Sequence, residues 1–192
     1  MFRDNLLFPV LLVAFMPLAG CSEAVPPAAE GAFQVNISSG ASPADCGLDI
    51  TAPITMGLVG PTSHDRLEKD TLNDAQVFCT VKQQGSAFSM EGYAAMPDSV
   101  MEFQVSSITA DANEGNPAFG RVTVAGPATA LNAMTSPDSE PCSFYFVNEA
   151  QRSQLAPGRA WFSFRCPSVE DVSINRSCGI DTSYAAFQNC EQ

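Results

Sequence analysis

The chain of 192 residues has few basic side chains and no run of them. Lysine and arginine together number 9 against 21 aspartates and glutamates, so the net charge is −12 at pH 7. The two lysines are Lys69 and Lys82. Such a composition excludes a basic surface for nucleic acid. It also disfavours electrostatic docking on anionic lipid, so we expect any attachment to a membrane to have another source.

Amphipathic helical periodicity is also missing, since no stretch repeats apolar residues every 3.6 positions over three turns. Short β-type runs recur instead about every ten residues, with Gly, Pro, Asn, Asp and Ser between them. We therefore predict an all-β fold, an antiparallel β-sandwich braced by disulfides, with a jelly roll or partly open barrel as the alternative. The 13 phenylalanines would fill its core.

Six regions carry the strand predictions. They are 33–37, 54–59, the hairpin of 76–82 with 87–93, the pair 100–108 with 121–125, the hairpin of 143–147 with 160–164, and 182–187. Residues 63–74 are polar and are expected to hold one short helical turn.

The sequence contains few of the residue patterns that are typical of enzyme active sites. The only histidine is His64, and no C-x-x-C pair occurs, which argues against a zinc site and a thioredoxin-like site. Ser63, His64 and Asp65 are the residue types of a hydrolase triad, but consecutive residues cannot converge on one another. No G-x-S-x-G elbow is present. We predict no cofactor, no metal and no catalytic residue, and expect His64 to be a solvated loop residue.

Two acidic loops have simple explanations. Residues 111–116 resemble a calcium loop, but glycine falls at position five (Gly115) and Val122 stands where the EF-hand has its bidentate glutamate. A hairpin turn fits the Asn, Gly and Pro content better. The loop at 136–141 is interpreted in the same way.

Other candidate residues are assigned to surface or packing. Glu170 and Asp171 are neighbours on an expected strand, so they face opposite ways and are expected to be exposed. Trp161 is expected to pack across strands rather than to bind a ligand. Asn36 and Asn175 fit the N-glycosylation pattern, which we treat as coincidence.

An even set of cysteines points to disulfides in an oxidising compartment. The six are Cys46, Cys79, Cys142, Cys166, Cys178 and Cys190. A hairpin centred near Gln154 places Cys142 opposite Cys166, close enough for a disulfide. Cys178 and Cys190 flank a short segment and are expected to close it, which leaves Cys46 for Cys79. The alternative joins Cys79 to Cys166 and Cys46 to Cys142.

The N-terminus has the layout of a signal peptide. One cation, Arg3, precedes an apolar stretch at 6–18 that is shorter than the roughly 20 residues of a membrane span. The following residues, Leu18-Ala19-Gly20-Cys21, resemble the lipobox of bacterial lipoproteins. This resemblance implies cleavage before Cys21, diacylglycerol on its sulfur and an acyl chain, such as palmitate, on its amine. Ser22 in the next position implies sorting to the outer membrane. An ordinary signal peptide of a secreted or periplasmic protein is the alternative.

The chain therefore divides into a signal peptide at 1–20, a lipidated cysteine with a flexible tether at 21–32 and a single β domain at 33–192. The tether prediction rests on small residues and a proline pair. Cysteines at strand ends, as in Val77-Phe78-Cys79 and Phe164-Arg165-Cys166, give the domain a resemblance to small cysteine-bearing β-sandwich lipoproteins.

These features predict a lipid-anchored cell-envelope protein that acts as a non-catalytic binding or structural module. Its membrane contact would be the N-terminal lipid, and its partner an envelope protein or glycan. Two alternatives are an envelope hydrolase with an unrecognised site and an inhibitor that presents a disulfide-braced loop at 178–190.

Overall fold

The computed structural model describes residues 26–40, 46–48, 50 and 52–192. Its regular elements are β1 (Glu30–Val35), β2 (Ile37–Ser38), β3 (Ile54–Met56), β4 (Glu68–Lys69), β5 (Gln76–Gln84), β6 (Ala87–Met96), β7 (Ser99–Thr109), β8 (Ala118–Ala125), the 3-10 helix η1 (Pro127–Thr129), β9 (Met134–Thr135), β10 (Cys142–Tyr145), α2 (Glu149–Arg152), β11 (Ala160–Asp171) and β12 (Arg176–Gln188). Within the described part of the chain, no helix has the length and apolar character needed to cross a membrane.

All named strands belong to one antiparallel sheet. Its main path runs β3-β1-β12-β11-β10-β8-β7-β6-β5, and β2, β4 and β9 join at its sides. The prediction of an all-β antiparallel fold braced by disulfides is confirmed. Because the path is continuous, a single sheet supplies both layers of the sandwich, with no break between the layers.

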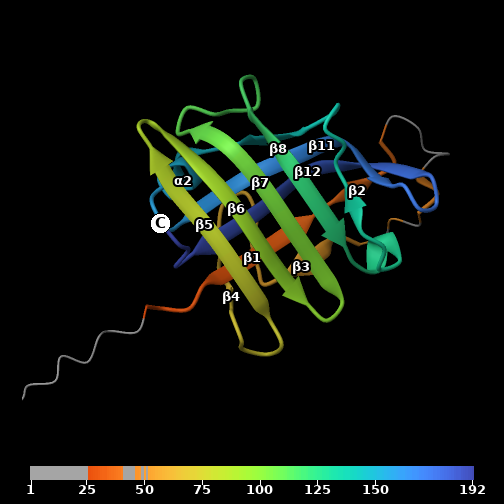
Figure 1. Ribbon diagram of the computed structural model, residues 1–192, viewed down its shortest axis with the longest axis horizontal. Helices are drawn as coiled ribbons and strands as arrows, with labels where there is room; N and C mark the ends of the chain where they lie inside the picture. Colours follow the sequence, from red (N-terminus) through yellow and green to blue (C-terminus); the bar gives the residue numbers. More distant parts are fainter. Residues whose placement is uncertain (1–25, 41–45, 49, 51) are drawn as a thin grey trace, which may run out of the picture.

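The sheet folds over itself into two layers that enclose the core. Strands β5 to β8 cross in front of β1, β11 and β12 (Figure 1). The ring of Phe103 on β7 lies 4.9 Å from that of Phe162 on β11 and 5.1 Å from that of Phe187 on β12. These centroid distances suit favourable aromatic pairs, so phenylalanines from both layers form the centre of the core.

The predicted hairpins form, and the one between β10 and β11 has the predicted register. Ser143 pairs with Arg165 and Tyr145 with Ser163, which centres that hairpin on Gln154. In the β5–β6 hairpin, Gly85 has a φ of +67°, a conformation that glycine adopts without steric cost. Along β7, alternate residues are buried as the pattern of 100–108 indicates. Short-range patterns therefore specified these pairs correctly.

The predicted tether is wrong at its C-terminal end. Glu30, Gly31 and Ala32 belong to β1 and pair with Gln188, Phe187 and Ala186 of β12. A Cβ atom on Gly31 would lie 2.9 Å from the ring of Phe187, so the small residue is required by packing. The small side chains predicted a flexible tether, but here they allow β1 to pack closely against β12. Residues 21–25 lie outside the described part.

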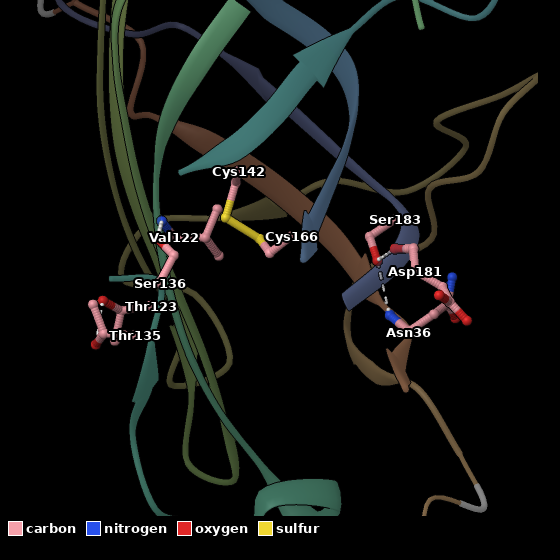
Figure 2. Close-up of a disulfide and its surroundings, with 9 residues drawn as sticks. All are labelled: Asn36, Val122, Thr123, Thr135, Ser136, Cys142, Cys166, Asp181 and Ser183. Atoms are coloured by element: carbon pink, nitrogen blue, oxygen red, sulfur yellow. Dashed lines mark hydrogen bonds between the residues drawn. A yellow bond between two sulfur atoms is a disulfide. The ribbon is translucent and has the colours of Figure 1, made fainter. Parts of the chain in front are cut away.

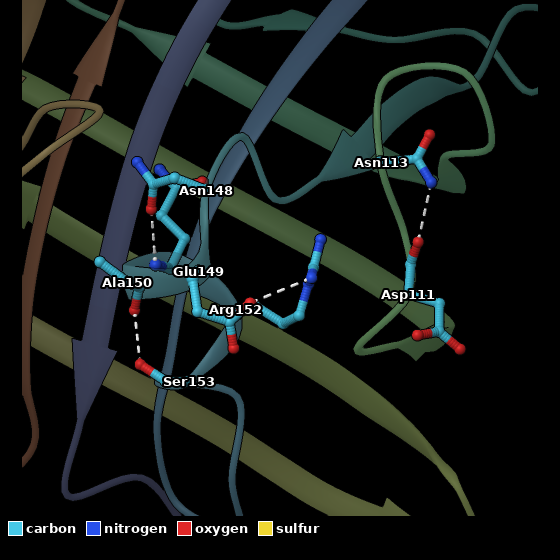
Figure 3. Close-up of polar contacts among 8 residues, drawn as sticks. Asp111, Asn113, Asn148, Glu149, Ala150, Arg152 and Ser153 are labelled. Carbon is cyan, nitrogen blue, oxygen red and sulfur yellow. Dashed lines mark hydrogen bonds and ion pairs between the residues drawn. The ribbon is translucent and has the colours of Figure 1, made fainter.

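Three other expectations need correction. The last strand is longer than 182–187, and its partner β11 continues beyond residue 164. Residues 63–74 hold β4 and turns but no helix. The helical turn lies instead at α2, where the Asn148 side chain accepts a hydrogen bond from the backbone N–H of Gln151 and caps the helix (Figure 3).

The disulfides are Cys142–Cys166, Cys79–Cys190 and Cys46–Cys178. The first is the pair that the hairpin predicts. The predicted Cys178–Cys190 pair is wrong because residues 176–188 form one extended strand, whose ten steps from Cys178 to Gln188 span about 33 Å at 3.3 Å per residue. The predicted Cys46–Cys79 pair is wrong as well. Cys46 bonds to Cys178 near the start of β12, whereas Cys79 bonds to Cys190 just beyond its end. The alternative set also fails.

The C-terminal segment closes one edge of the sheet. Glu191 accepts a hydrogen bond from the backbone N–H of Val81 and donates its own N–H to the carbonyl of Cys79, both at 2.9 Å. The carboxylate of Asp70 accepts the N–H of Val77 at 2.9 Å. Outward backbone groups of Val77, Cys79 and Val81 therefore have partners, so this part of β5 is not left as an open edge.

Candidate functional site

A groove of about 980 Å³ lies on the outer face of the sheet, over β8, β10, β11, β12 and β2. At the other end of the same layer, the loop around Gly60 covers the outer face. There the indole N–H of Trp161 donates to the carbonyl of Gly60 at 3.1 Å, and Val59 and Leu67 pack on Trp161 and Ala186. The groove is the part of this face that the loop leaves open.

A row of four side chains crosses the groove. Phe119, Ser143 and Arg165 are paired neighbours on β8, β10 and β11, so their side chains share the outer face. Asp181 continues the row on β12. Phe119 is 59% exposed, an unusual position for a phenylalanine in a chain whose other aromatic residues mostly fill the core. The row therefore offers a ring, a hydroxyl, a cation and an anion to solvent.

Irregular pairing of β11 with β12 shapes the middle of the groove. Phe164 pairs with Ser183 and Cys166 with Ile180, so Arg165 faces two residues of β12 instead of one. A second register shift follows between Cys166 and Val169. Bulges of this kind bend a strand and redirect its side chains, and they are frequent beside functional sites.

The Cys142–Cys166 disulfide is buried beneath the groove (Figure 2), and of its two residues Cys166 lines the groove. It joins β10 to β11 at the point where the pairing becomes irregular. Beside it, the hydroxyl of Ser136 accepts the N–H of Val122 at 3.0 Å, which fixes the start of the loop that carries Glu140. The disulfide and this hydrogen bond hold the floor and one rim in place.

The opposite rim is built by a close approach of backbones. Gly40 has a φ of +61°, and a Cβ atom there would lie 3.0 Å from the backbone nitrogen of Gly179. A Cβ atom on Gly179 would lie 2.7 Å from the hydroxyl oxygen of Ser38. Asn36 fastens the segment to β12, because its N–H donates to the hydroxyl of Ser183 at 2.9 Å (Figure 2).

The groove carries an excess of negative charge. The guanidinium of Arg165 is 3.0 Å from the carboxylate of Glu114, which reaches it from the β7–β8 loop. Glu140 and Asp181 are exposed, and within the described ranges neither forms an ion pair. The single cation is therefore neutralised, while two carboxylates at the rims remain free to meet an incoming charge.

The triad-like residues take a different arrangement. His64 is half-buried rather than solvated, and its ring lies 4.6 Å from that of Trp161. The hydroxyl of Ser63 donates to the carboxylate of Asp65 at 2.9 Å, not to His64. Trp161 is only 3% exposed and packs as predicted. These residues hold the loop around Gly60 against the sheet.

The two acidic loops have the predicted turn character. Asn113 accepts hydrogen bonds from the N–H groups of Gly115 and Asn116, at 3.0 and 3.2 Å, and its amide donates to the carbonyl of Asp111 (Figure 3). In the second loop, Asp138 pairs with Arg121 at 3.0 Å. Within the described ranges, no group of three or more His, Cys, Asp and Glu gathers in a way that suits a metal ion.

The remaining predicted residues fall in several places. Asp171 is 6% exposed rather than exposed as predicted, and it accepts hydrogen bonds from the backbone N–H and the hydroxyl of Ser173 at the tip of the β11–β12 hairpin. Asn175 lies in that tip with a φ of +51°. The braced loop predicted at 178–190 is a strand, which removes the basis for an inhibitor of that design. The predicted lipidation site, Cys21, is outside the described residues.

No protein family, curated protein or solved structure matches this chain. The groove itself was not found from the sequence. Phe119, Arg165 and Asp181 come from separate strands, and only the three-dimensional pairing places them in one row. The signal that could have marked it is Phe119, which in the alternation of 118–125 falls on the same side as the polar Arg121 and Thr123.

Proposed function

We propose that this chain is a lipid-anchored cell-envelope protein, sorted to the outer membrane, and that it acts as a non-catalytic binding module. The groove over β8, β10, β11, β12 and β2 is its binding site. The observation that carries this proposal is the row of Phe119, Ser143, Arg165 and Asp181 over a disulfide-braced floor. A rigid surface with an exposed ring and convergent polar groups is typical of binding sites.

The location rests on two lines of support. Three disulfides are compatible with an extracytoplasmic compartment. The segment ending in Cys21 supplies the anchor, because two or more acyl chains hold a protein on a bilayer where one is marginal. The net charge of −12 gives the domain no electrostatic attraction to anionic lipid that could replace this anchor.

Mass spectrometry of the protein from membrane fractions tests the anchor. The N-terminal peptide should begin at Cys21 and carry the added mass of diacylglycerol and one acyl chain. Cys21→Ser should remove that mass and release the protein from the membrane fraction. A peptide that begins at Cys21 without added mass would contradict the anchor.

Site-directed photo-crosslinking in cells tests the groove. A photoreactive phenylalanine analogue at Phe119 should give a crosslinked product, and the same analogue at Phe78 serves as the matched control. Phe78 is 52% exposed but lies on β5, in the other layer. Products that are the same from both positions, or none from Phe119, would contradict a binding role for the groove.

A further inference from the structure

We infer that the occupant of the groove is a short extended peptide segment with basic side chains, supplied by a partner protein. This inference rests on the proposed function, because it names the partner class of the same site. Three properties of the groove support it: its unpaired charge, its length and its exposed ring.

The charge comes first. Glu140 and Asp181 stand exposed at two sides of the groove, and the Glu114 carboxylate neutralises the guanidinium of Arg165 at 3.0 Å. An anionic occupant would meet two carboxylates and no available cation. A cationic occupant gains two ion pairs, and the net charge of −12 attracts it from a distance. Electrostatic complementarity therefore selects a basic partner.

The length selects a short extended chain. From β8 to β2 the groove crosses four inter-strand spacings, which is about 19 Å at 4.8 Å each. An extended peptide covers that distance with about six residues at 3.3 Å per residue. Alternate side chains of such a peptide face the same surface, so every second residue meets the floor.

The ring of Phe119 determines which side chain should accompany the basic residue in the peptide. Phe119 and Asp181 are three strand spacings apart, about 14 Å, which corresponds to four residues of an extended chain. A lysine that meets Asp181 therefore places the residue four positions away over the ring of Phe119. An apolar side chain, or a cation over the ring face, is favourable there.

Titration of the purified protein with designed hexapeptides tests this inference. The probe alternates lysine with threonine and carries phenylalanine four positions from its first lysine. Two control peptides replace the lysines by glutamine or by glutamate. At low salt, we expect the lysine peptide to bind at least tenfold more tightly than the glutamate peptide. Amide NMR shifts should be confined to Ser143, Arg165 and Asp181 and their neighbours, and should weaken as salt is added.

A pair of charge variants provides the matched control. Glu140→Gln with Asp181→Asn should weaken binding of the lysine peptide about fivefold, the size expected for two exposed ion pairs. Glu91→Gln with Glu102→Gln makes the same change of net charge on β6 and β7 and should leave binding unchanged. Equal losses from both pairs would show that only net charge matters, which overturns the inference.

Two further outcomes would also overturn it. One is equal binding of all three hexapeptides. The other is a glycan occupant, seen if chitotriose, a short glycan, shifts the amide NMR signals of the groove and the lysine peptide does not. The proposed function fails separately, when no crosslink forms from Phe119. A partner that crosslinks there and binds equally well to the Glu140→Gln, Asp181→Asn variant leaves that function standing and refutes the basic peptide.

Discussion

Cys79, near the middle of β5, is bonded to Cys190, two positions before the end of the chain. This disulfide holds the C-terminal segment beside β5, where Glu191 exchanges two backbone hydrogen bonds with the strand. The bond therefore does more than restrict the unfolded chain. It keeps a partner on a strand that would otherwise offer its backbone to another molecule.

Removal of this disulfide should destabilise the protein and promote its association. We expect Cys79→Ser with Cys190→Ser to lower the free energy of unfolding by about 2–4 kcal/mol, measured by urea denaturation. Freed from its covalent hold, the C-terminal segment should leave β5, and light scattering should detect aggregates. Cys142→Ser with Cys166→Ser is the matched control, because it removes a buried disulfide without uncovering an edge. Equal aggregation of the two variants would refute the protective role.

Gly31 offers a test of where the domain begins. Gly31→Ala places a methyl group 2.9 Å from the ring of Phe187 and 3.1 Å from Val77. Overpacking of a core in this way should cost about 1–3 kcal/mol of stability, seen as a lower midpoint in urea. Gly60→Ala meets no atom within 4 Å and should change little. If Gly31→Ala were as harmless as Gly60→Ala, residue 31 would belong to the tether.

Gln151 tests the polar contacts beneath α2. Its side-chain oxygen accepts the N–H of Val147 at 3.0 Å and the hydroxyl of Ser163 at 3.1 Å, and Gln151 is fully buried. Gln151→Leu leaves both donors without a partner, which should cost about 2 kcal/mol or more. Adding Ser163→Ala should restore part of this loss in a double-mutant cycle. Gln154 follows α2 and is only half-buried, so Gln154→Leu serves as the control and should leave the stability almost unchanged.

Tyr184 predicts how stability changes in alkali. Burial, and secondarily the neighbouring Tyr145, raise the pKa of Tyr184 above its ordinary value of 10.0. The folded protein thus retains a proton that the unfolded chain releases. The stabilisation is complete below pH 10 and is lost as the pH rises through the raised pKa. Tyr184→Phe should flatten the fall of urea stability as the pH rises above 10; a fall of the same steepness in this variant would contradict the role of Tyr184.

The sequence predicted what neighbouring residues determine. Alternation and turn residues defined the β10–β11 hairpin and hence the Cys142–Cys166 bond, whose partners are 24 residues apart. The other two disulfides join residues 132 and 111 positions apart. Those distances depend on how the sheet folds over itself, which no local pattern records.

The groove escaped prediction for a related physical reason. Its row takes one side chain from each of four strands, and its shape depends on register shifts between β11 and β12. An unpaired extra residue leaves no mark in composition or periodicity. Small residues led to a wrong prediction at the start of the domain. Close packing at Gly31 and flexibility in a tether both favour small amino acids, so composition cannot distinguish the two.

The pairing of the cysteines constrains how the protein can mature. A chain that emerges N-terminus first would, if oxidised at once, join its cysteines in consecutive order, as Cys46–Cys79, Cys142–Cys166 and Cys178–Cys190. Two of those three bonds are non-native. Cys46 and Cys79 must remain reduced until more than a hundred further residues have emerged, or be released from a wrong bond by thiol–disulfide exchange. Correct biogenesis therefore depends on a disulfide isomerase or on delayed oxidation.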